Sequence, residues 1–249
     1  DPRRQRQMCI RDRFNTSTNF EKDILLRKAI NYAIDREKMM KFLRKNIGYP
    51  ALSGLVPNGL NNDFYSDRYF KNTELANKYL NEYKKINDID NISLDLTTDA
   101  QYLDILEFIQ SELKSLGINL KINITPPSIL RQGKATGKFN IFRASWIADY
   151  ANPENYFSLF YSKNHTPYGP NYTFFQNEEY DKLYEQTLSL NKKDELNKIY
   201  EKLEEIINEF SPIIPLYYDM SVRLKQKNIF GLKNNPLNIL DLKTVYKKK

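Results

Sequence analysis

A charged and aromatic stretch near the middle of the chain carries the residues best suited to binding chemistry. Arg143, Trp146 and Asp149 follow one another at three-residue intervals, and Trp146 is the only tryptophan among the 249 residues. If this segment is an extended strand, alternation places Arg143, Ser145, Ile147 and Asp149 on one face. A guanidinium can hold a carboxylate through two hydrogen bonds, and a carboxylate in a poorly solvated cleft can hold an ammonium group. The two charges could therefore meet the two ends of a zwitterion, with Trp146 as a flat apolar wall.

The same residues also have a purely structural interpretation. Arg143 could pair with a neighbouring helix, Trp146 could fill the core, and Asp149 could form an Asx-turn before Asn152 and Pro153 break the segment. On residue types and spacing alone, this interpretation is at least as well supported as a ligand site.

Catalytic and metal chemistries find little support in the sequence. His165 is the only histidine and Cys9 the only cysteine, which excludes histidine clusters for zinc, sites with several cysteines and an internal disulfide. No nucleophile elbow or glycine-rich phosphate motif is present, and His165 lies in a stretch with loop composition. Asp149 and Glu154 could form a glycosidase pair, but 31 acidic residues make such pairs common by chance. We therefore expect no enzyme, no cofactor and no metal, with a hydrolase acting through acidic residues as a less favoured alternative.

The net charge of +7 is concentrated at the two ends of the chain. Residues 1–13 carry five arginines against two aspartates, and residues 247–249 are three lysines, which leaves +1 for everything between them. This distribution does not predict a nucleic-acid groove. Because residues 1–13 show no apolar period, we expect them to be an extraneous segment; the alternative is a basic arm that binds a partner.

Hydrophobic periodicity predicts the helices that must position the charged stretch. Six amphipathic helices are expected, at residues 23–34, 36–46, 72–85, 104–117, 178–190 and 193–210. Asp35 is the predicted N-terminal cap of the second helix, and Pro212 ends the last one. Residues 49–67 are rich in Pro, Gly and Asn and are expected to form an irregular connection, and residues 128–138 a short helix or loop.

Alternating hydrophobicity predicts strands at residues 92–98, 118–124 and 139–146. With the helix between the first two, they form a predicted right-handed parallel βαβ unit in an α/β fold. Ligand sites in such sheets lie at the ends of the strands. Two more short strands are expected in residues 213–232 and one in residues 243–249.

No apolar run approaches the roughly 20 residues that cross a bilayer, so any export signal is expected outside this chain.

Six motifs in a fixed order carry a family resemblance. They are RKAINYAIDREKMM, GYPALSGLVP, YFKNTELANKYLNE, RASWIADYANPENYF, NYTFFQNEEYDKLYEQ and SPIIPLYY. Together they resemble the C-terminal half of the extracellular solute-binding proteins of oligopeptide and dipeptide ABC importers, over about residues 23–246.

The resemblance implies a periplasmic-binding-protein-like clamp of two lobes that closes over a solute. Residues 14–218 would form the α/β ligand-binding lobe, and residues 219–249 a return segment to a first lobe that this fragment lacks. The implied function is the capture of peptides for import, with a membrane permease as partner, no nucleic acid, and a monomeric state. The implied location is periplasmic or otherwise extracytoplasmic, either soluble or lipid-anchored.

The resemblance also assigns roles to the residues of the charged stretch. In oligopeptide-binding members the Asp of the W-x-x-D element takes the α-ammonium group of the peptide, which implies this role for Asp149. The Arg three residues before the Trp contacts peptide carboxylates in some members, which implies that role for Arg143. Backbone around Ser145 and Ile147 would form a ladder with the extended peptide. Other members bind sugars, nickel or haem, so an oligosaccharide is the alternative solute, while a single histidine argues against nickel.

Overall fold

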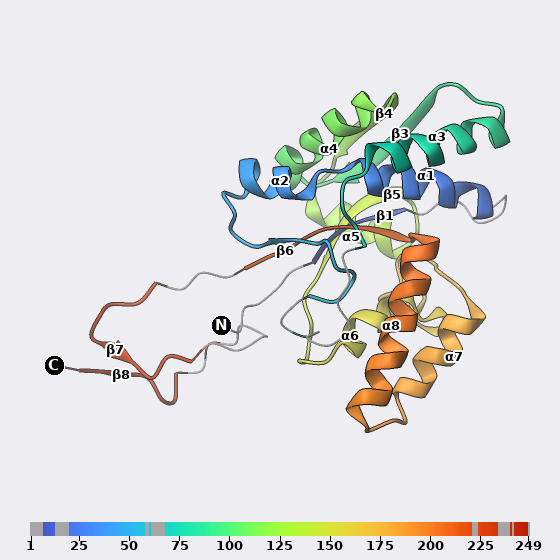
Figure 1. The fold of residues 1–249 in the computed structure, drawn as a ribbon. Coiled ribbons are helices and arrows are strands. Elements are labelled where there is room, and N and C mark those ends of the chain that lie inside the picture. Colours follow the sequence, from blue (N-terminus) through green and yellow to red (C-terminus); the bar gives the residue numbers. More distant parts are fainter. Residues whose placement is uncertain are drawn as a thin grey trace.

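A mixed six-stranded sheet lies at the centre of the protein (Figure 1). The computed structural model describes residues 7–12, 20–57, 60, 68–220, 224–233, 240 and 242–248. The sheet has the order β2-β6-β1-β5-β3-β4. Its strands are β1 (Gln7–Asp12), β2 (Tyr49–Pro50), β3 (Ile92–Thr98), β4 (Ile118–Ile124), β5 (Ile141–Trp146) and β6 (Ile213–Tyr218).

Eight α-helices in the described residues connect and cover these strands. They are α1 (Phe20–Ala33), α2 (Arg36–Leu43), α3 (Thr73–Asn87), α4 (Leu103–Ser115), α5 (Pro127–Ala135), α6 (Glu154–Phe157), α7 (Glu178–Thr187) and α8 (Lys193–Phe210). Short 3₁₀ turns occupy Ala100–Tyr102, Ser158–Phe160 and Ser162–Asn164. The predicted α/β class is therefore confirmed.

The predicted βαβ unit is present, and its two strands have the predicted bounds. β3 and β4 pair in parallel with Ile92 opposite Ile118, and α4 crosses between them. Alternation buries Ile92, Leu94 and Leu96 of β3 in the core cluster that also contains the apolar residues of α4. β5 extends the parallel arrangement, with Leu96 opposite Ile141 and Thr97 opposite Phe142. The start of β5 therefore lies next to the end of β3, and the rest of β5 runs beyond it.

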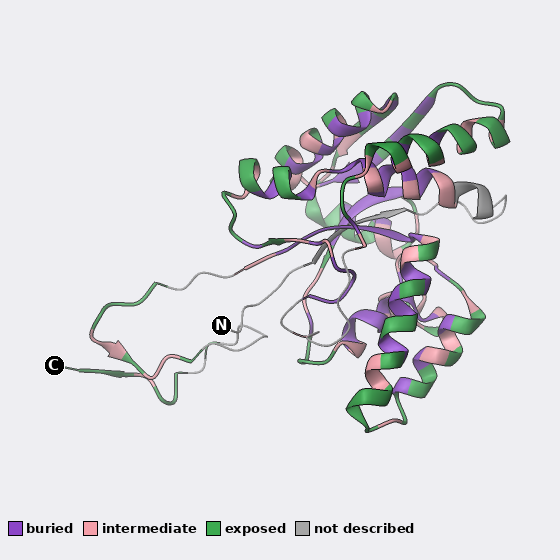
Figure 2. Cartoon of the chain, viewed as in Figure 1, coloured by how far each residue is buried: buried purple, intermediate pink, exposed green. Residues whose placement is uncertain are grey.

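Three packing layers follow from the amphipathic patterns. Helices α1, α2 and α4 pack on the sheet and α3 packs on α1, and their apolar residues form the largest core cluster among the described residues. Helix α5 packs through Leu130 against Phe142 and Ala144 on β5. Helices α6, α7 and α8 form a second core with the loop that carries Leu55 and Val56. Figure 2 shows the buried residues along the central strands and the inward faces of the helices.

The side chain of Arg36 ties α2 to β6. It is only 1% exposed, and its guanidinium donates to the backbone oxygens of Pro215 at 2.6 Å, Tyr69 at 2.8 Å and Asn31 at 3.0 Å. Such buried charges need this degree of hydrogen bonding. Arg36 therefore fixes α2 against the strand that leads to Asp219.

Helix α2 begins as predicted and ends earlier than predicted. The side chain of Asp35 accepts a hydrogen bond from the backbone N–H of Lys38 at 2.8 Å, which confirms the predicted cap. The helix stops at Leu43 instead of residue 46, because Lys45 and Asn46 take positive φ angles of 49° and 57°. Asparagine tolerates this left-handed conformation, so the turn forms without glycine.

Strand β1 lies between β5 and β6 and pairs antiparallel with both. This differs from the expectation that residues 1–13 stand outside the fold, because six of these residues take a place in the sheet. Strand pairing uses backbone N–H and C=O groups, so a position between two strands accepts a segment whose side chains show no apolar period. The origin of the segment and the boundary at residue 14 stay predictions.

The last part of the chain forms a separate two-stranded sheet. β7 (Ile229–Phe230) pairs antiparallel with β8 (Tyr246–Lys247), and both lie away from the central sheet in Figure 1. Together with β6, these are the short strands expected beyond Pro212. That residues 219–249 return to a first lobe stays a prediction.

Candidate ligand-binding site

Arg143 and Ser145 line one cavity beyond the end of β3. The cavity has a volume of about 220 Å³ and is lined by Arg44, Gln101, Tyr102, Asp104, Ile105, Arg143, Ser145, Tyr217 and Asp219. Phe142 and Ala144 pack on the opposite face of β5, against α5. The alternation expected from the sequence therefore separates a polar face from an apolar face along this strand.

The guanidinium of Arg143 is held inside the cavity without an acidic partner. Arg143 is 8% exposed, its Cζ lies 3.1 Å from the ring centroid of Tyr102, and no ion pair within 4.0 Å involves it in the described part of the chain. Its Nε is buried and lacks a hydrogen-bond partner. Burial lowers the pKa of Arg143 below its usual value, and Tyr102 opposes this shift. An anion in the cavity would offset the cost of burying this charge.

A second arginine in the same cavity could not be found from the sequence. Arg44 follows the last residue of α2, and its Nη2 lies 2.8 Å from Oδ1 of Asp219, the residue after β6. The guanidinium also lies over the ring of Tyr217, with 5.1 Å between Cζ and the ring centroid. These residues belong to elements far apart in the chain that meet only in the fold. No local pattern in the sequence signals their approach.

Asn155 organises the segment that carries Trp146 and Asp149. Its side chain is 4% exposed, and its Oδ1 accepts hydrogen bonds from Nε1 of Trp146 at 2.7 Å and from the backbone N–H of Asp149 at 3.3 Å. Trp146 packs against the core formed by α6 to α8, to which Ala148 also belongs. Asn155 is not among the residues predicted from the sequence, although it follows Asn152 and Pro153 at the break in the segment.

Asp149 lies exposed beyond the end of β5. Among the described residues, its backbone N–H is held by Asn155, and no hydrogen bond or ion pair engages its carboxylate. The structural interpretation in which an Asx-turn takes up this carboxylate therefore finds no support. The carboxylate is open to a ligand.

The predicted ladder residues lie at the border of the strand. β5 ends at Trp146, so Ile147 lies outside it, and Ser145 is exposed. On one side Ser145 is opposite Met8 of β1, while the pairing with β3 on the other side reaches only Phe142. Within the described residues, the β3 side of Ser145 therefore has no strand partner. The ladder with a peptide stays a prediction.

Each carboxylate oxygen of Glu154 accepts a hydrogen bond from a tyrosine, which weakens the glycosidase alternative. One oxygen accepts a hydrogen bond from the hydroxyl of Tyr150 and the other from the hydroxyl of Tyr184. Burial, together with the neighbouring Glu154, raises the pKa of Tyr184 above its usual value. A general acid or base must be free to exchange its proton with a substrate, and Glu154 instead bridges two tyrosines.

The described residues show no other catalytic or metal constellation. Nε2 of His165 lies 3.0 Å from the backbone oxygen of Phe175, within the loop predicted for it. No group of three His, Cys, Asp or Glu side chains in the described part of the chain could hold a metal ion.

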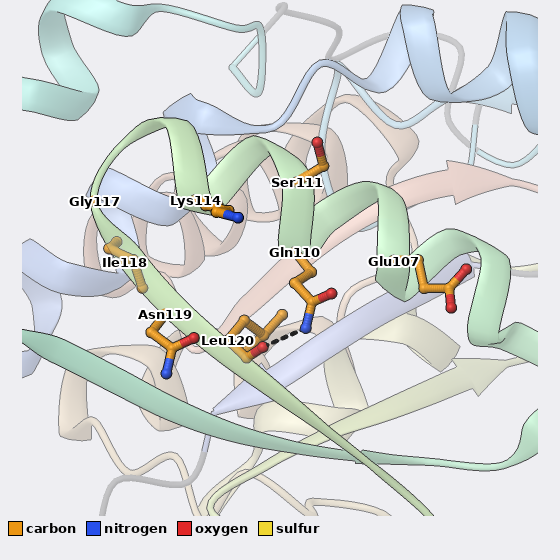
Figure 3. A pocket seen from close by; sticks show the side chains of 8 residues that line it. All are labelled: Glu107, Gln110, Ser111, Lys114, Gly117, Ile118, Asn119 and Leu120. Atoms are coloured by element: carbon orange, nitrogen blue, oxygen red, sulfur yellow. Dashed lines mark hydrogen bonds between the residues drawn. The ribbon is translucent and has the colours of Figure 1, made fainter.

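A larger cavity of about 670 Å³ lies elsewhere, between α4 and the edge strand β4 (Figure 3). Glu107, Gln110, Ser111 and Lys114 line it from the helix. The side chain of Gln110 donates to the backbone oxygen of Leu120 at 2.6 Å. None of the five residues predicted for the ligand site lines this cavity, so volume alone does not identify that site.

Comparison with known proteins places the chain in a family of solute-binding proteins. Residues 6–168 match the sequence model of the bacterial extracellular solute-binding proteins, family 5 Middle. The chain is 28% identical over 243 residues to the dipeptide-binding protein DppE of Bacillus subtilis, which covers 93% of this chain and 44% of DppE. None of the described helices is long and apolar enough to cross a membrane.

Solved structures share the fold. The Escherichia coli murein tripeptide-binding protein MppA superposes with a TM-score of 0.82 and 24% identity, over 100% of this chain and 49% of MppA. The oligopeptide-binding protein AppA of Bacillus subtilis, in complex with a nonapeptide, gives a TM-score of 0.77 and 24% identity, over 99% of this chain and 51% of AppA. The chain therefore spans about half the length of the relatives it matches.

Proposed function

Because this chain belongs to the family 5 bacterial extracellular solute-binding proteins, we propose that it is the peptide-holding half of the substrate-binding component of an ABC importer. The family consists of binding proteins and not of enzymes. DppE is named for binding dipeptides, and AppA is described in complex with a nonapeptide. The names of these relatives therefore support a peptide as the solute.

The charges of Arg143 and Asp149 support this proposal from the chain's own residues. The buried guanidinium of Arg143 has no acidic partner in the described structure, and the open carboxylate of Asp149 follows it on the same strand end. Opposite charges in this order suit the carboxylate and the ammonium group of a peptide. Trp146 lies between them in the sequence, and its half-buried indole, fixed by Asn155 and packed against the core of α6 to α8, would offer its remaining apolar surface.

The cavity around Arg143 would take the carboxylate end. The Nε atom of Arg143 is buried without a hydrogen-bond partner, and Arg143 makes no ion pair in the described part of the chain. Unsatisfied buried donors are costly, and a ligand oxygen would remove that cost. The carboxylate of Asp149 would take the ammonium end, with the backbone near Ser145 and Ile147 along the peptide.

We further propose a clamp that needs a second lobe. Residues 14–218 would form the ligand-binding lobe, residues 219–249 would return to the other lobe, and closure would be favoured by a ligand that bridges both. The protein would act as a monomer outside the cytoplasm and deliver its peptide to a membrane permease. The relative MppA from Escherichia coli is named a periplasmic protein.

Calorimetry on the full-length protein that carries this chain tests the function. We expect trialanine to bind with one-to-one stoichiometry and maltotriose to give no saturable heat. Asp149→Ala should abolish the trialanine signal. Binding of maltotriose alone, unaffected by Asp149→Ala, would overturn the peptide assignment in favour of an oligosaccharide.

A further inference from the structure

The two arginines of the candidate site differ in their charge balance. Nη2 of Arg44 lies 2.8 Å from Oδ1 of Asp219, whereas Arg143 makes no ion pair in the described part of the chain. The same oxygen of Asp219 accepts the backbone N–H of Met220 at 3.0 Å, which fixes the carboxylate in place. One arginine is therefore neutralised by the protein itself and the other is not.

Both guanidinium groups are oriented before any ligand arrives. Arg143 stacks on Tyr102 with 3.1 Å between Cζ and the ring centroid, and Arg44 lies over Tyr217 at 5.1 Å. Arginine held by aromatic stacking and ion pairing loses little further freedom when it binds a carboxylate. Both side chains are therefore held in place, and the two arginines differ only in whether a protein carboxylate already neutralises their charge.

The charges around the cavity leave room for one carboxylate. Among the lining residues, two positive groups, Arg143 and Arg44, face one fixed negative group, Asp219, so these three charges sum to +1. Asp99 does not line the cavity, and its charge acts on Arg143 from outside it. Asp104 also lines the cavity but is exposed, and its Oδ1 accepts the N–H of Ile105, so water screens its charge. A second ligand carboxylate would have to compete with Asp219 for Arg44 and would meet a like charge.

We propose that Asp219 is a specificity-determining residue that reserves Arg44 and limits this cavity to a single ligand carboxylate. The inference rests on the proposed peptide-binding function. It follows that the protein discriminates against peptides whose last residue is Asp or Glu, because these carry a second carboxylate near the first. Removing the charge of Asp219 would release Arg44 to accept it.

The test compares two tripeptides that differ only in the last residue. Affinities of the full-length protein for Ala-Ala-Ala and Ala-Ala-Glu are measured by calorimetry in the wild type and in Asp219→Asn. We expect the ratio Kd(Ala-Ala-Glu)/Kd(Ala-Ala-Ala) to fall about tenfold in the variant, the change that one hydrogen bond to a charged group supplies. Asp95→Asn is the matched control, because it removes an aspartate that pairs with Lys121 at 3.7 Å on the β3–β4 edge. Its ratio should equal that of the wild type.

A second variant keeps the proposal falsifiable if Asp219→Asn does not fold. Arg44→Gln leaves Asp219 charged and unpaired, so the same ratio should rise several-fold above the wild type. If the ratio stays within about twofold of the wild type in both variants while Ala-Ala-Ala still binds, the proposed role of Asp219 is overturned and the proposed peptide-binding function is not. Failure of the wild type to bind either tripeptide would overturn the proposed function, and this inference with it.

Discussion

The side-chain oxygen of Asn155 accepts a hydrogen bond from the indole nitrogen of Trp146 at 2.7 Å, from a position nine residues further along the chain. The same oxygen accepts the backbone N–H of Asp149 at 3.3 Å. One buried amide thus fixes both the indole of Trp146 and the backbone at Asp149. The segment between the end of β5 and the start of α6 is held by this contact.

Replacing Asn155 by Ala should therefore loosen the candidate site. Two donors would lose their acceptor, and we expect a loss of about 2 kcal/mol in the free energy of unfolding. Because Trp146 is the only tryptophan, its fluorescence emission should shift to longer wavelength as water reaches the ring. Urea unfolding followed by this emission measures both effects. Asn119→Ala, which removes an exposed amide on β4, should change stability by less than about 0.5 kcal/mol, and equal losses in the two variants would contradict the role of Asn155.

The close approach of Gly54 to Glu204 predicts that a side chain at position 54 destabilises the fold. Gly54 has a φ of +147°, and a Cβ there would lie 2.7 to 2.8 Å from the carboxylate atoms of Glu204. Gly117 also has a positive φ, of +81°, but a Cβ there would meet nothing within 4 Å. Gly117→Ala should cost about 1 kcal/mol through backbone conformation alone, and Gly54→Ala roughly 2 kcal/mol more through overpacking. Thermal unfolding of both variants would contradict this account if Gly54→Ala were the milder change.

Glu204 should make stability depend on pH. It is 2% exposed, and it accepts hydrogen bonds from the backbone N–H groups of Leu55 and Val56. Burial raises the pKa of Glu204 to about 7, although these two hydrogen bonds act to lower it. The folded state therefore holds its proton more tightly than the unfolded state does, and the free energy of unfolding should fall as pH rises from about 4.5 to about 7.

Glu204→Gln isolates this effect, because glutamine does not titrate. The stability of the wild type relative to Glu204→Gln should decline by at most roughly 3 kcal/mol between pH 4.5 and pH 7 and stay constant above and below that window. Urea titrations at several pH values give the difference directly. A difference that rose with pH would show that the folded state lowers the pKa of Glu204 instead.

The chain by itself should hold peptide weakly. If the clamp closes on its ligand from two sides, a chain that spans about half the length of its relatives makes only part of the contacts. We expect trialanine to give no measurable heat at micromolar concentrations of this chain, although the full-length protein binds it. Micromolar affinity of the chain alone would contradict the need for a second lobe.

Local patterns predicted the parts of the fold that are fixed by local physics. Alternation in β3 and β4 gave their bounds, because their apolar positions up to Ile122 belong to the core cluster that includes α4. Asp35 predicted the start of α2, because its side chain caps the helix by accepting the N–H three residues further along the chain. The strand face that carries Arg143 and Ser145 also followed from alternation, because both line the same cavity.

The remaining features depend on contacts between distant elements. Arg44 and Asp219 are 175 positions apart and meet where Arg36 and the apolar core hold α2 against β6. The pairing of β1 uses backbone groups that carry no residue signature. The early end of α2 depends on left-handed Lys45 and Asn46, residues that helical propensity alone would have kept in the helix.

The central claim is that Asp149 binds the ammonium end of a peptide, and a coupling cycle tests it most directly. The affinity of the full-length protein is measured for trialanine and N-acetyl-trialanine, in the wild type and in Asp149→Asn. The account predicts that each change alone weakens binding at least about tenfold, and that the two together weaken it little further, because both remove the same ion pair. Penalties that simply add would show that Asp149 and the peptide ammonium do not interact, and would contradict the account.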